Sequence, residues 1–452
     1  MMMMMMMYFI TILLLSSVLS LCYSFQSLLE KANNKINSNI NRIIKSDGTI
    51  KLPESSSEYD WDLHKVAFSL LPLSPGRRRK TILEEIVSGQ IWTLDQVQGI
   101  VNVNVPVRSV IVKLRKGGLL VYNPVAPTRE VIDMVNNLEK EYGKVKHIVL
   151  GTLGLEHKAL AGPFTQYFYN ADIWLQPGQW AFPVNLPLAF LGFPLNNRVK
   201  EIPANSIDAP WYEDFDHQVL GPLRFKSVGG FGETAMFHRD TNTLIVTDTV
   251  VKVADSPAKI LEDDPRALLY HSRDSITDKV EDTDDARRRG WRRMVLFGLV
   301  FFPSGISVSG VVEAFTSLAK LNPNYKVLGK GAIPINSGLY PWSWAIDEKK
   351  SFEALQKGLL VAPILRKLIL DREPQRVLQW ADQVSRWNIK RIIPSHLENN
   401  IKANGKEFRE AFSFLEYKKD SKARPLPEDL NFLNIISDIC TRYGIVAPSE
   451  LK

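Results

Sequence analysis

The sequence predicts an α/β fold in which short buried strands alternate with loops and helices. Apolar runs typical of buried strands, such as residues 145–150, are followed by glycine-rich loops and by helical segments. Polar residues of the kind that bind metals follow three such strands: the pair Glu156 and His157, then Asp248, then His396. Because strand ends on one edge of a sheet converge in space, the three positions predict one polar site.

The first 55 residues have the composition of a targeting leader. Residues 1–24 contain an apolar run from Tyr8 to Val18 followed by small residues, which is typical of a secretory signal peptide and too short for a membrane anchor. Residues 25–55 are basic, poor in acids and rich in Asn and Ser, as transit peptides are. Together the two segments resemble the bipartite leader of algae with secondary plastids. This resemblance implies a plastid protein, with secretion as the alternative.

The rest of the chain has the length and composition of a globular protein. With 452 residues, of which 45% are hydrophobic, it can bury one large core or two modest ones. Removal of the leader would leave Cys440 as the only cysteine, so no internal disulfide is expected. No membrane span is expected in the mature chain, because its apolar stretches, such as residues 294–302, are too short.

The formal charge of +7 does not predict nucleic-acid binding. The leader supplies part of this charge. The basic tract at residues 287–293 directly follows the acidic run at residues 281–285, which offsets its field within a Debye length of about 8 Å. Phosphate binding needs an unopposed basic face, so nucleic acid is not an expected partner.

The opening part of the folded chain is predicted to contain a helix, a hairpin and a second helix. Residues 59–100 are interpreted as an N-terminal extension that packs on the core, with a helix near residues 79–87. The β-branched residues at mostly even spacing from Val103 to Val112, followed by residues 119–122, predict a hairpin. Thr128 is a candidate N-cap, and the apolar spacing from Val131 to Leu138 predicts a helix after it.

The strand at residues 145–150 is expected to lead into a loop that carries Glu156 and His157, with a helix at residues 159–169. Further strands are expected at residues 234–238, at residues 244–247 before Asp248, and at residues 391–395 before His396. The metal-ligand residues would therefore lie just after strands. A helical region is expected between residues 351 and 387, and residues 421–452 are interpreted as a tail.

Two insertions are predicted within the domain that spans residues 101–420. Residues 255–345 combine charged helices with apolar stretches. Residues 171–211 carry many prolines and aromatic residues, and could cover the core or bind a protein partner. The aromatic residues of this aromatic insertion are Trp174, Trp180, Phe182, Phe190, Phe193 and Trp211.

Six segments between about residues 90 and 415 carry a resemblance to a known family. They read QIWTLDQVQGI, VYNPVAPT, GLEHK, VTDTV, VAPIL and IIPSH. They resemble the domain of unknown function 4336 family of cyanobacteria, algae and plants. The order of elements also resembles the metallo-β-lactamase-like fold, an αββα sandwich whose metals bind at a sheet edge. The resemblance implies this fold and a plastid setting, and it carries no known activity.

The superfamily's metal motif is only partly present, which implies a degenerate site. The motif His-x-His-x-Asp-His ends on Glu156 and His157, but no histidine occurs within residues 152–155. Phe231 stands in the glycine turn where a further histidine is expected. The first metal's histidines are therefore absent, whereas the second metal's ligands have counterparts in Glu156, His157, Asp248 and His396.

Two carboxylates and two imidazoles suit one divalent ion, with zinc, iron and manganese as the candidates by ligand type. A dead site that holds no metal is the alternative, and Lys158 places a positive charge beside the ligands. The remaining histidines at positions 147, 217, 238 and 271 are interpreted as ordinary surface or core residues.

Three functional hypotheses follow from this sequence. The first is a plastid protein with a degenerate metallo-hydrolase-like domain that is non-catalytic or binds a single metal. The second is a metal-dependent hydrolase of ester, thioester or phosphoester substrates. The third is a protein-interaction module that uses the aromatic insertion.

Overall fold

A computed structural model describes residues 58–61, 73–74, 78–100, 103–180, 187–224, 229–275, 278, 280–308, 342–416 and 421–451. The leader predicted at residues 1–55 lies outside the described residues. The plastid localisation that it implies therefore stays a prediction.

The larger of two main sheets contains eight strands among the described residues, in the order β1-β3-β4-β5-β6-β7-β8, with β2 paired to β3. Strands β5, β6, β7 and β8 are mutually parallel, whereas the β2-β3-β4-β5 run is antiparallel. The strands are β1 (Leu73–Ser74), β2 (Ile82–Val87), β3 (Ile91–Ile100), β4 (Val103–Lys113), β5 (Leu119–Tyr122), β6 (Val145–Leu150), β7 (Asp172–Leu175) and β8 (Val199–Glu201).

The smaller main sheet has the order β17-β16-β11-β10-β9, and β11 and β16 are parallel. Two short antiparallel pairs, β12 with β15 and β13 with β14, lie outside both main sheets. The bounds are β9 (Phe215–Arg224), β10 (Gly230–His238), β11 (Thr243–Val246), β12 (Val251–Lys252), β13 (Ile306–Val308), β14 (Trp342–Trp344), β15 (Leu359–Leu360), β16 (Arg391–Pro394) and β17 (Ile401–Lys402).

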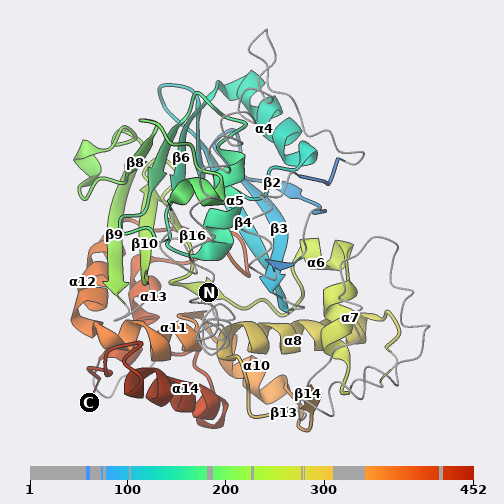
Figure 1. Cartoon of the computed structure of the whole chain (residues 1–452). Helices are drawn as coiled ribbons and strands as arrows, with labels where there is room; N and C mark the ends of the chain where they lie inside the picture. The colour runs from blue at the N-terminus through green and yellow to red at the C-terminus, as the bar shows by residue number, and fades with distance from the viewer. Residues whose placement is uncertain are drawn as a thin grey trace, which may run out of the picture.

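Helices cover both outer faces of the sheets, and α8, α10, α11 and α14 gather at the lower end of the molecule in Figure 1. Short 3-10 helices lie between several of the α-helices. The α-helices are α4 (Arg129–Tyr142), α5 (Leu155–Phe164), α6 (Lys259–Asp263), α7 (Arg266–Ser272), α8 (Asp284–Val300), α10 (Lys349–Leu355), α11 (Pro363–Leu368), α12 (Pro374–Ser385), α13 (Gly405–Glu410) and α14 (Asn431–Arg442).

Three hydrophobic clusters define the αββα layers. One lies between the sheets, where Val110 of the larger sheet shares a cluster with Ile245 and Ile393 of the smaller one. A second joins the other face of the larger sheet to α4 and α5, and a third joins the other face of the smaller sheet to helices that include α12 and α13. Alternate residues of a strand point to opposite faces, so β4 contributes Val107 to one cluster and Val110 to another. The predicted α/β class and αββα sandwich are confirmed.

The prediction of a helix near residues 79–87 is wrong. Residues 82–87 form β2, which pairs antiparallel with β3, and its exposed and half-buried residues alternate along most of the strand. Pairing with β3 overrides the helical preference of the local sequence. The predicted boundary at residue 100 between an extension and the domain lies inside the β3–β4 hairpin, so β2 and β3 are part of the larger sheet.

The elements predicted between residues 103 and 150 are confirmed. Strands β4 and β5 form an antiparallel hairpin, and Val107, Val110 and Val112 are fully buried. Helix α4 begins after Thr128, whose hydroxyl accepts a hydrogen bond from the backbone N–H of Val131 as an N-cap does. Strand β6 follows α4 and pairs in parallel with β5.

The aromatic insertion at residues 171–211 is partly integral to the sheet. Strands β7 and β8, which extend the larger sheet, come from this segment. Trp174, Phe193 and Trp211 are buried in the core, whereas Phe182 and the side chain of Phe190 lie outside the described residues. Buried aromatic rings are not free to contact a partner, so the interaction-module hypothesis gains no support from these three residues.

The described parts of the three remaining segments contain helices. Residues 255–345 contribute α6, α7 and α8, and the helical region expected from residue 351 is divided into α10, α11 and α12 with β15 between them. Residues 421–452 are more than a tail, because α14 buries Leu433 and Cys440 against the domain. Within the part of the chain that the structure describes, no helix has the length and hydropathy needed to cross a bilayer.

Candidate metal centre

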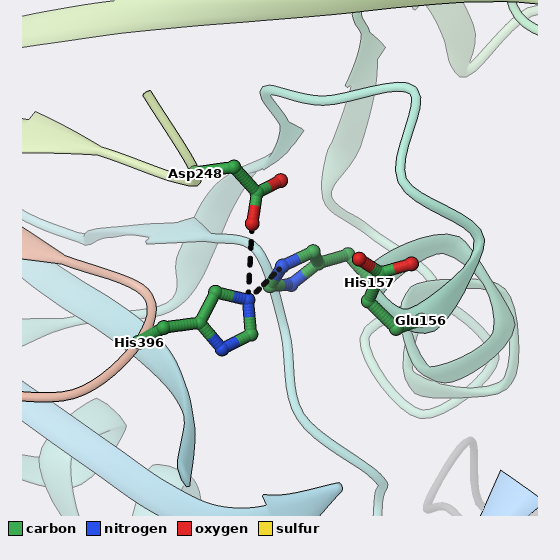
Figure 2. Close-up of side chains that lie close together, drawn as sticks. All are labelled: Glu156, His157, Asp248 and His396. Atoms are coloured by element: carbon green, nitrogen blue, oxygen red, sulfur yellow. Dashed lines mark hydrogen bonds and ion pairs between the residues drawn. The ribbon is translucent and has the colours of Figure 1, made fainter. Parts of the chain in front are cut away.

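Four predicted residues meet where strands of both sheets end. His157 and Glu156 lie in the first turn of α5, not in a loop as predicted, because the helix that follows β6 begins at Leu155. Asp248 follows β11 by two residues and His396 follows β16 by two residues. Because β11 and β16 are parallel neighbours, both side chains emerge at the same sheet edge. Figure 2 shows them facing His157 and Glu156 across a small gap.

The nearest donor atoms of three residues have the spacing of a coordination shell. His396 Nε2 lies 3.1 Å from His157 Nε2 and 3.2 Å from Asp248 Oδ1 (Figure 2). A tetrahedral ion with bonds of about 2.0–2.1 Å needs ligand atoms about 3.3 Å apart. We refer to His157, Asp248 and His396 as the ligand triad. The two edges that meet at His396 therefore match one ion, and potential ligand atoms of His157 and Asp248 lie within 4.8 Å of each other.

Glu156 is the fourth and more distant candidate ligand. Potential ligand atoms of all four residues lie within 4.8 Å of one another, so a side-chain rotation would bring Glu156 into the shell. Gly154 leaves room for this carboxylate, since a Cβ at position 154 would lie 3.3 Å from Glu156 Oε1. The glycine that stands near the position of a superfamily histidine thus leaves room for Glu156, whose side chain is longer than the Asp of the superfamily motif.

The imidazole of His396 is held in one tautomer. Its Nδ1 lies 2.7 Å from the backbone carbonyl oxygen of Pro106, which can only accept a hydrogen bond. Nδ1 therefore carries the proton, and in the neutral ring Nε2 directs its lone pair at the centre of the triad. A second hydrogen bond of this kind is the usual way in which proteins orient a metal-binding histidine.

The two histidines of the triad have opposite electrostatic environments. Burial lowers the pKa of His157 to about 4, so its imidazole is neutral at pH 7. Burial also favours neutral His396, but its hydrogen bond to Asp248 and the charges of Asp248 and Glu156 outweigh this effect and raise its pKa. Among the described residues, His157 Nδ1 and Asp248 Oδ2 have no hydrogen-bond partner although both atoms are buried. Buried polar atoms without partners are costly, and the Asp248 oxygen could bind an ion. His157 Nδ1 lies across the imidazole ring from the Nε2 that faces His396, so it does not face the triad.

Glu233, which the sequence analysis did not single out, fixes the turn that carries Asp248. Its side chain is fully buried, and Oε2 accepts hydrogen bonds from the backbone N–H groups of Asp248 at 2.6 Å and Thr249 at 2.9 Å. Oε1 accepts a third from the Thr249 hydroxyl. Burial, together with the nearby Asp248 charge, raises the pKa of Glu233 to about 7. The sequence signal that could have indicated this role was a carboxylate, Glu233, directly after the glycine-rich turn at residues 229–232.

Asn123 connects the three segments that lead to the candidate ligands. Its Oδ1 accepts from the Gly151 N–H, and its Nδ2 lies 2.8 Å from Thr247 Oγ1 and 3.3 Å from Ser395 Oγ. These partners precede the His157 helix, Asp248 and His396 respectively. Asn123 is fully buried with a φ of 47°, a left-handed conformation that Asn tolerates better than most residues.

Other residues stand where the histidines of the superfamily's metal motif would be. Thr152 forms a backbone bridge with Glu233, and Phe231 is buried in the core.

Lys158 does not point its charge openly at the ligands, since its side chain is buried and Nζ donates to the Trp180 carbonyl oxygen at 2.8 Å. Burial lowers the pKa of Lys158 to about 7. The remaining histidines 217, 238 and 271 are buried, and His147 is partly buried.

The αββα sandwich with a cluster of ligand-type side chains at its sheet edge defines a metallo-β-lactamase-like fold. Within that class, this chain belongs to the family described as a domain of unknown function (DUF4336), which matches residues 88–414. No curated protein matches the chain.

Solved structures with related architecture include two kinds of protein. A flavo di-iron protein mutant from Thermotoga maritima is 8% identical with a TM-score of 0.36, and the match covers 74% of this chain and 62% of that one. A metal-soaked flavodiiron core from Synechocystis is also 8% identical with a TM-score of 0.37, covering 75% and 61%. This chain thus spans about three fifths of the flavodiiron chains.

A metallo-beta-lactamase from Pontibacter korlensis is 14% identical to this chain with a TM-score of 0.29, and the match covers 42% of this chain and 83% of that one. Because all three scores are low, the fold assignment depends on the layers and strand order described above. The four predicted ligands are brought together, and metal binding by them stays a prediction.

Proposed function

We propose that this protein binds one divalent metal ion through His157, Asp248 and His396, with Glu156 as a fourth ligand. The spacing of the ligand triad carries the proposal, because 3.1 Å and 3.2 Å between donor atoms match the edges of one coordination shell. Only one such shell is proposed, since Thr152, Gly154 and Phe231 stand where the superfamily's other histidines would be.

The residues present fit zinc, iron or manganese by chemistry. Imidazole suits zinc and iron, and carboxylates also suit manganese. His157 would bind as a neutral ring, and His396 would keep its Nδ1 proton on the Pro106 carbonyl oxygen. When bound, such an ion supplies Lewis-acid chemistry, either for catalysis or to hold the ends of both sheets together.

A metal-dependent hydrolase of ester, thioester or phosphoester substrates is the second candidate. One observation favours it over a purely structural site: the side chains of His396 and Asp248 keep 13% and 11% of their surface exposed, whereas His157 is fully buried. One side of the ligand triad thus reaches solvent. Catalytic metal sites keep a coordination position for water or substrate, whereas structural sites fill all four with protein ligands, so this candidate requires Glu156 to stay outside the shell.

Elemental analysis of the purified full chain tests metal binding. About one ion per chain is expected for the wild type after zinc, iron and manganese are offered separately. His157→Ala and His396→Ala should lose it, because each removes a ligand. The control His238→Gln replaces a buried histidine outside the site and should keep its metal. A wild type without metal would reject the proposal, and two ions per chain would contradict a mononuclear site.

Activity separates the two candidate roles. If the hydrolase candidate is correct, the metal-loaded chain should cleave at least one ester, thioester or phosphoester in a substrate screen, and Asp248→Asn should abolish the cleavage. Stable metal binding without turnover of any of these substrates would leave the non-catalytic mononuclear role.

We also propose that residues 1–55 direct the protein to a plastid. The support is compositional: an apolar run typical of a signal peptide precedes a basic, acid-poor segment typical of a transit peptide. Secretion is the alternative destination.

A further inference from the structure

We infer that Arg108 and Asp95 are positioning residues for the metal ligand His396. The inference rests on the proposed metal site and assigns a role to the β3–β4 hairpin of the larger sheet. The hairpin lies against the turn at residues 394–397, which leaves the smaller sheet and carries His396.

Arg108 binds the backbone on both sides of His396. Its Nη1 donates to the Pro394 carbonyl oxygen at 2.7 Å, and its Nη2 donates to the Leu397 carbonyl oxygen at 3.1 Å. The backbone N–H of Arg108 also donates to the Ser395 carbonyl oxygen at 2.8 Å. The side chain is 1% exposed, so water does not compete for these contacts.

Asp95 holds the guanidinium of Arg108 in this orientation. Its Oδ1 accepts from Nε at 2.7 Å and its Oδ2 accepts from Nη2 at 2.9 Å, which is a bidentate pair. The two residues face each other directly across β3 and β4. A lysine could not make this pair and bind two carbonyl groups, because the planar fork of five N–H donors is specific to arginine.

The same strand fixes the ring of His396. Pro106 lies two residues before Arg108, so both residues lie on the same face of β4. The Pro106 carbonyl oxygen accepts the His396 Nδ1 proton, while Arg108 holds the backbone of the turn. One strand therefore controls both the position and the tautomer of this ligand.

The backbone conformation of the turn at residues 394–397 requires stabilising contacts from outside the turn. Leu397 has a φ of 58°, the left-handed region that a branched non-glycine residue rarely adopts. Such conformations persist when surrounding contacts enforce them. The Leu397 carbonyl oxygen is one of the two acceptors of the Arg108 side chain. The most strained residue of the turn is thus bound directly by the guanidinium.

The first test measures zinc affinity by chelator competition in the full chain. Arg108→Lys should raise the Kd for Zn²⁺ about 10- to 100-fold, the usual effect of losing a contact that orients a ligand. Asp95→Asn should raise the Kd by less than Arg108→Lys does. It provides a second test of the pair in case Arg108→Lys does not fold. The matched control is Arg372→Met, which removes another buried arginine that donates to carbonyl groups, those of Lys367 and Ala447. That control should lower thermal stability and leave the Kd unchanged.

The second test uses the protein without added metal and separates this inference from the proposed function. In 15N-histidine-labelled chain at one alkaline pH, His396 should be the Nδ1–H tautomer in the wild type and in Arg372→Met. Arg108→Lys and Asp95→Asn should mix the two tautomers. If the wild type binds no zinc but the tautomers respond in this way, the proposed function fails and the positioning role stands.

The inference would be overturned if Arg108→Lys and Asp95→Asn fold, keep the wild-type tautomer of His396 and bind zinc with a Kd within about twofold of wild type. In that case the two residues would affect only the melting temperature, which is a structural role and not a positioning role. A zinc-binding wild type with this outcome would leave the proposed function intact.

Discussion

Asn123 contacts the three segments that lead to the candidate ligands. Its side chain contacts Gly151, Thr247 and Ser395, and the last of these lies 272 positions away in the sequence. The residue combines these contacts with a left-handed backbone, so its side chain and its conformation contribute separately to stability. Two substitutions can separate the two contributions.

Asn123→Ala should destabilise the fold by about 2–4 kcal/mol, because it leaves buried polar groups unpaired and replaces Asn by a residue that tolerates the left-handed region less well. Asn123→Gly loses the same hydrogen bonds but relieves the backbone, so it should be less destabilised by about 1 kcal/mol. Denaturant unfolding of both variants measures the difference. A free energy of unfolding for Asn123→Ala within about 0.5 kcal/mol of wild type would refute this role.

His238 should make the protein sensitive to acid. Burial lowers its pKa to about 4, and it is 1% exposed, whereas in the unfolded chain the pKa is near 6.5. The unfolded chain therefore binds this proton first as the pH falls. The stabilisation is fully present above pH 6.5 and is lost as the pH falls toward 4, at about 1.4 kcal/mol per pH unit.

His238→Gln removes this titration, so the pH dependence of unfolding should be weaker by about one proton between pH 6.5 and 4. Wild type and variant unfolded in denaturant across this range give the comparison, and other groups that titrate there cancel in the difference. Identical pH profiles for the two proteins would show that the buried ring carries no such penalty.

At the scale of elements, β4 serves both faces of the larger sheet. Val107 belongs to the cluster shared with α4, and Val110 and Val112 belong to the cluster between the sheets. Pro106 and Arg108, which lie on the face of Val110, contact the His396 turn. The strand therefore links core packing to the geometry of the candidate site.

Val107→Asp should leave the domain insoluble or unfolded, since an unpaired buried charge costs several kcal/mol. Val105→Asp is the matched variant on the same strand, and it should lose less stability because Val105 is only half-buried. Solubility and thermal unfolding measure both. Equal melting of Val107→Asp and wild type would contradict the burial of this position.

Elements were predicted correctly where their sequence pattern lies within a few neighbouring residues. The N-cap at Thr128, the apolar face of α4 and the β-branched residues of β4 are all read within a few residues. The segment at residues 82–87 was predicted incorrectly because its leucine and glutamates suit a helix, while its partner β3 decides for a strand. The start of α5 at Leu155 was missed because no side chain caps it.

At the scale of the whole molecule, the site depends on contacts between distant segments. His157 and His396 are 239 positions apart, and Arg108 and Pro394 are 286 apart. The convergence of the four residues was predicted from their places after strands and from the family resemblance, since strand order fixes which strand ends meet. The roles of Asn123, Arg108 and Glu233 were not predicted, because their partners become neighbours only after both sheets have packed together.

The leader prediction concerns the molecule's destination. Residues 1–55 fused to a fluorescent reporter in an alga with a secondary plastid should send the reporter into the plastid, because the signal-type and transit-type segments act in sequence. A fusion of residues 1–24 alone is the control and should stop in the secretory pathway. Reporter from the longer fusion confined to the medium or the endoplasmic reticulum would favour secretion.

Anomalous X-ray diffraction from crystals of the protein soaked separately with zinc, iron and manganese would locate a metal ion at the ligand triad directly. We expect one anomalous peak per chain for at least one of these metals. For zinc the peak should lie about 2.0–2.2 Å from His157 Nε2, His396 Nε2 and a carboxylate oxygen of Asp248. No peak beside the ligand triad with any of the three metals, or two peaks there, would contradict this expectation.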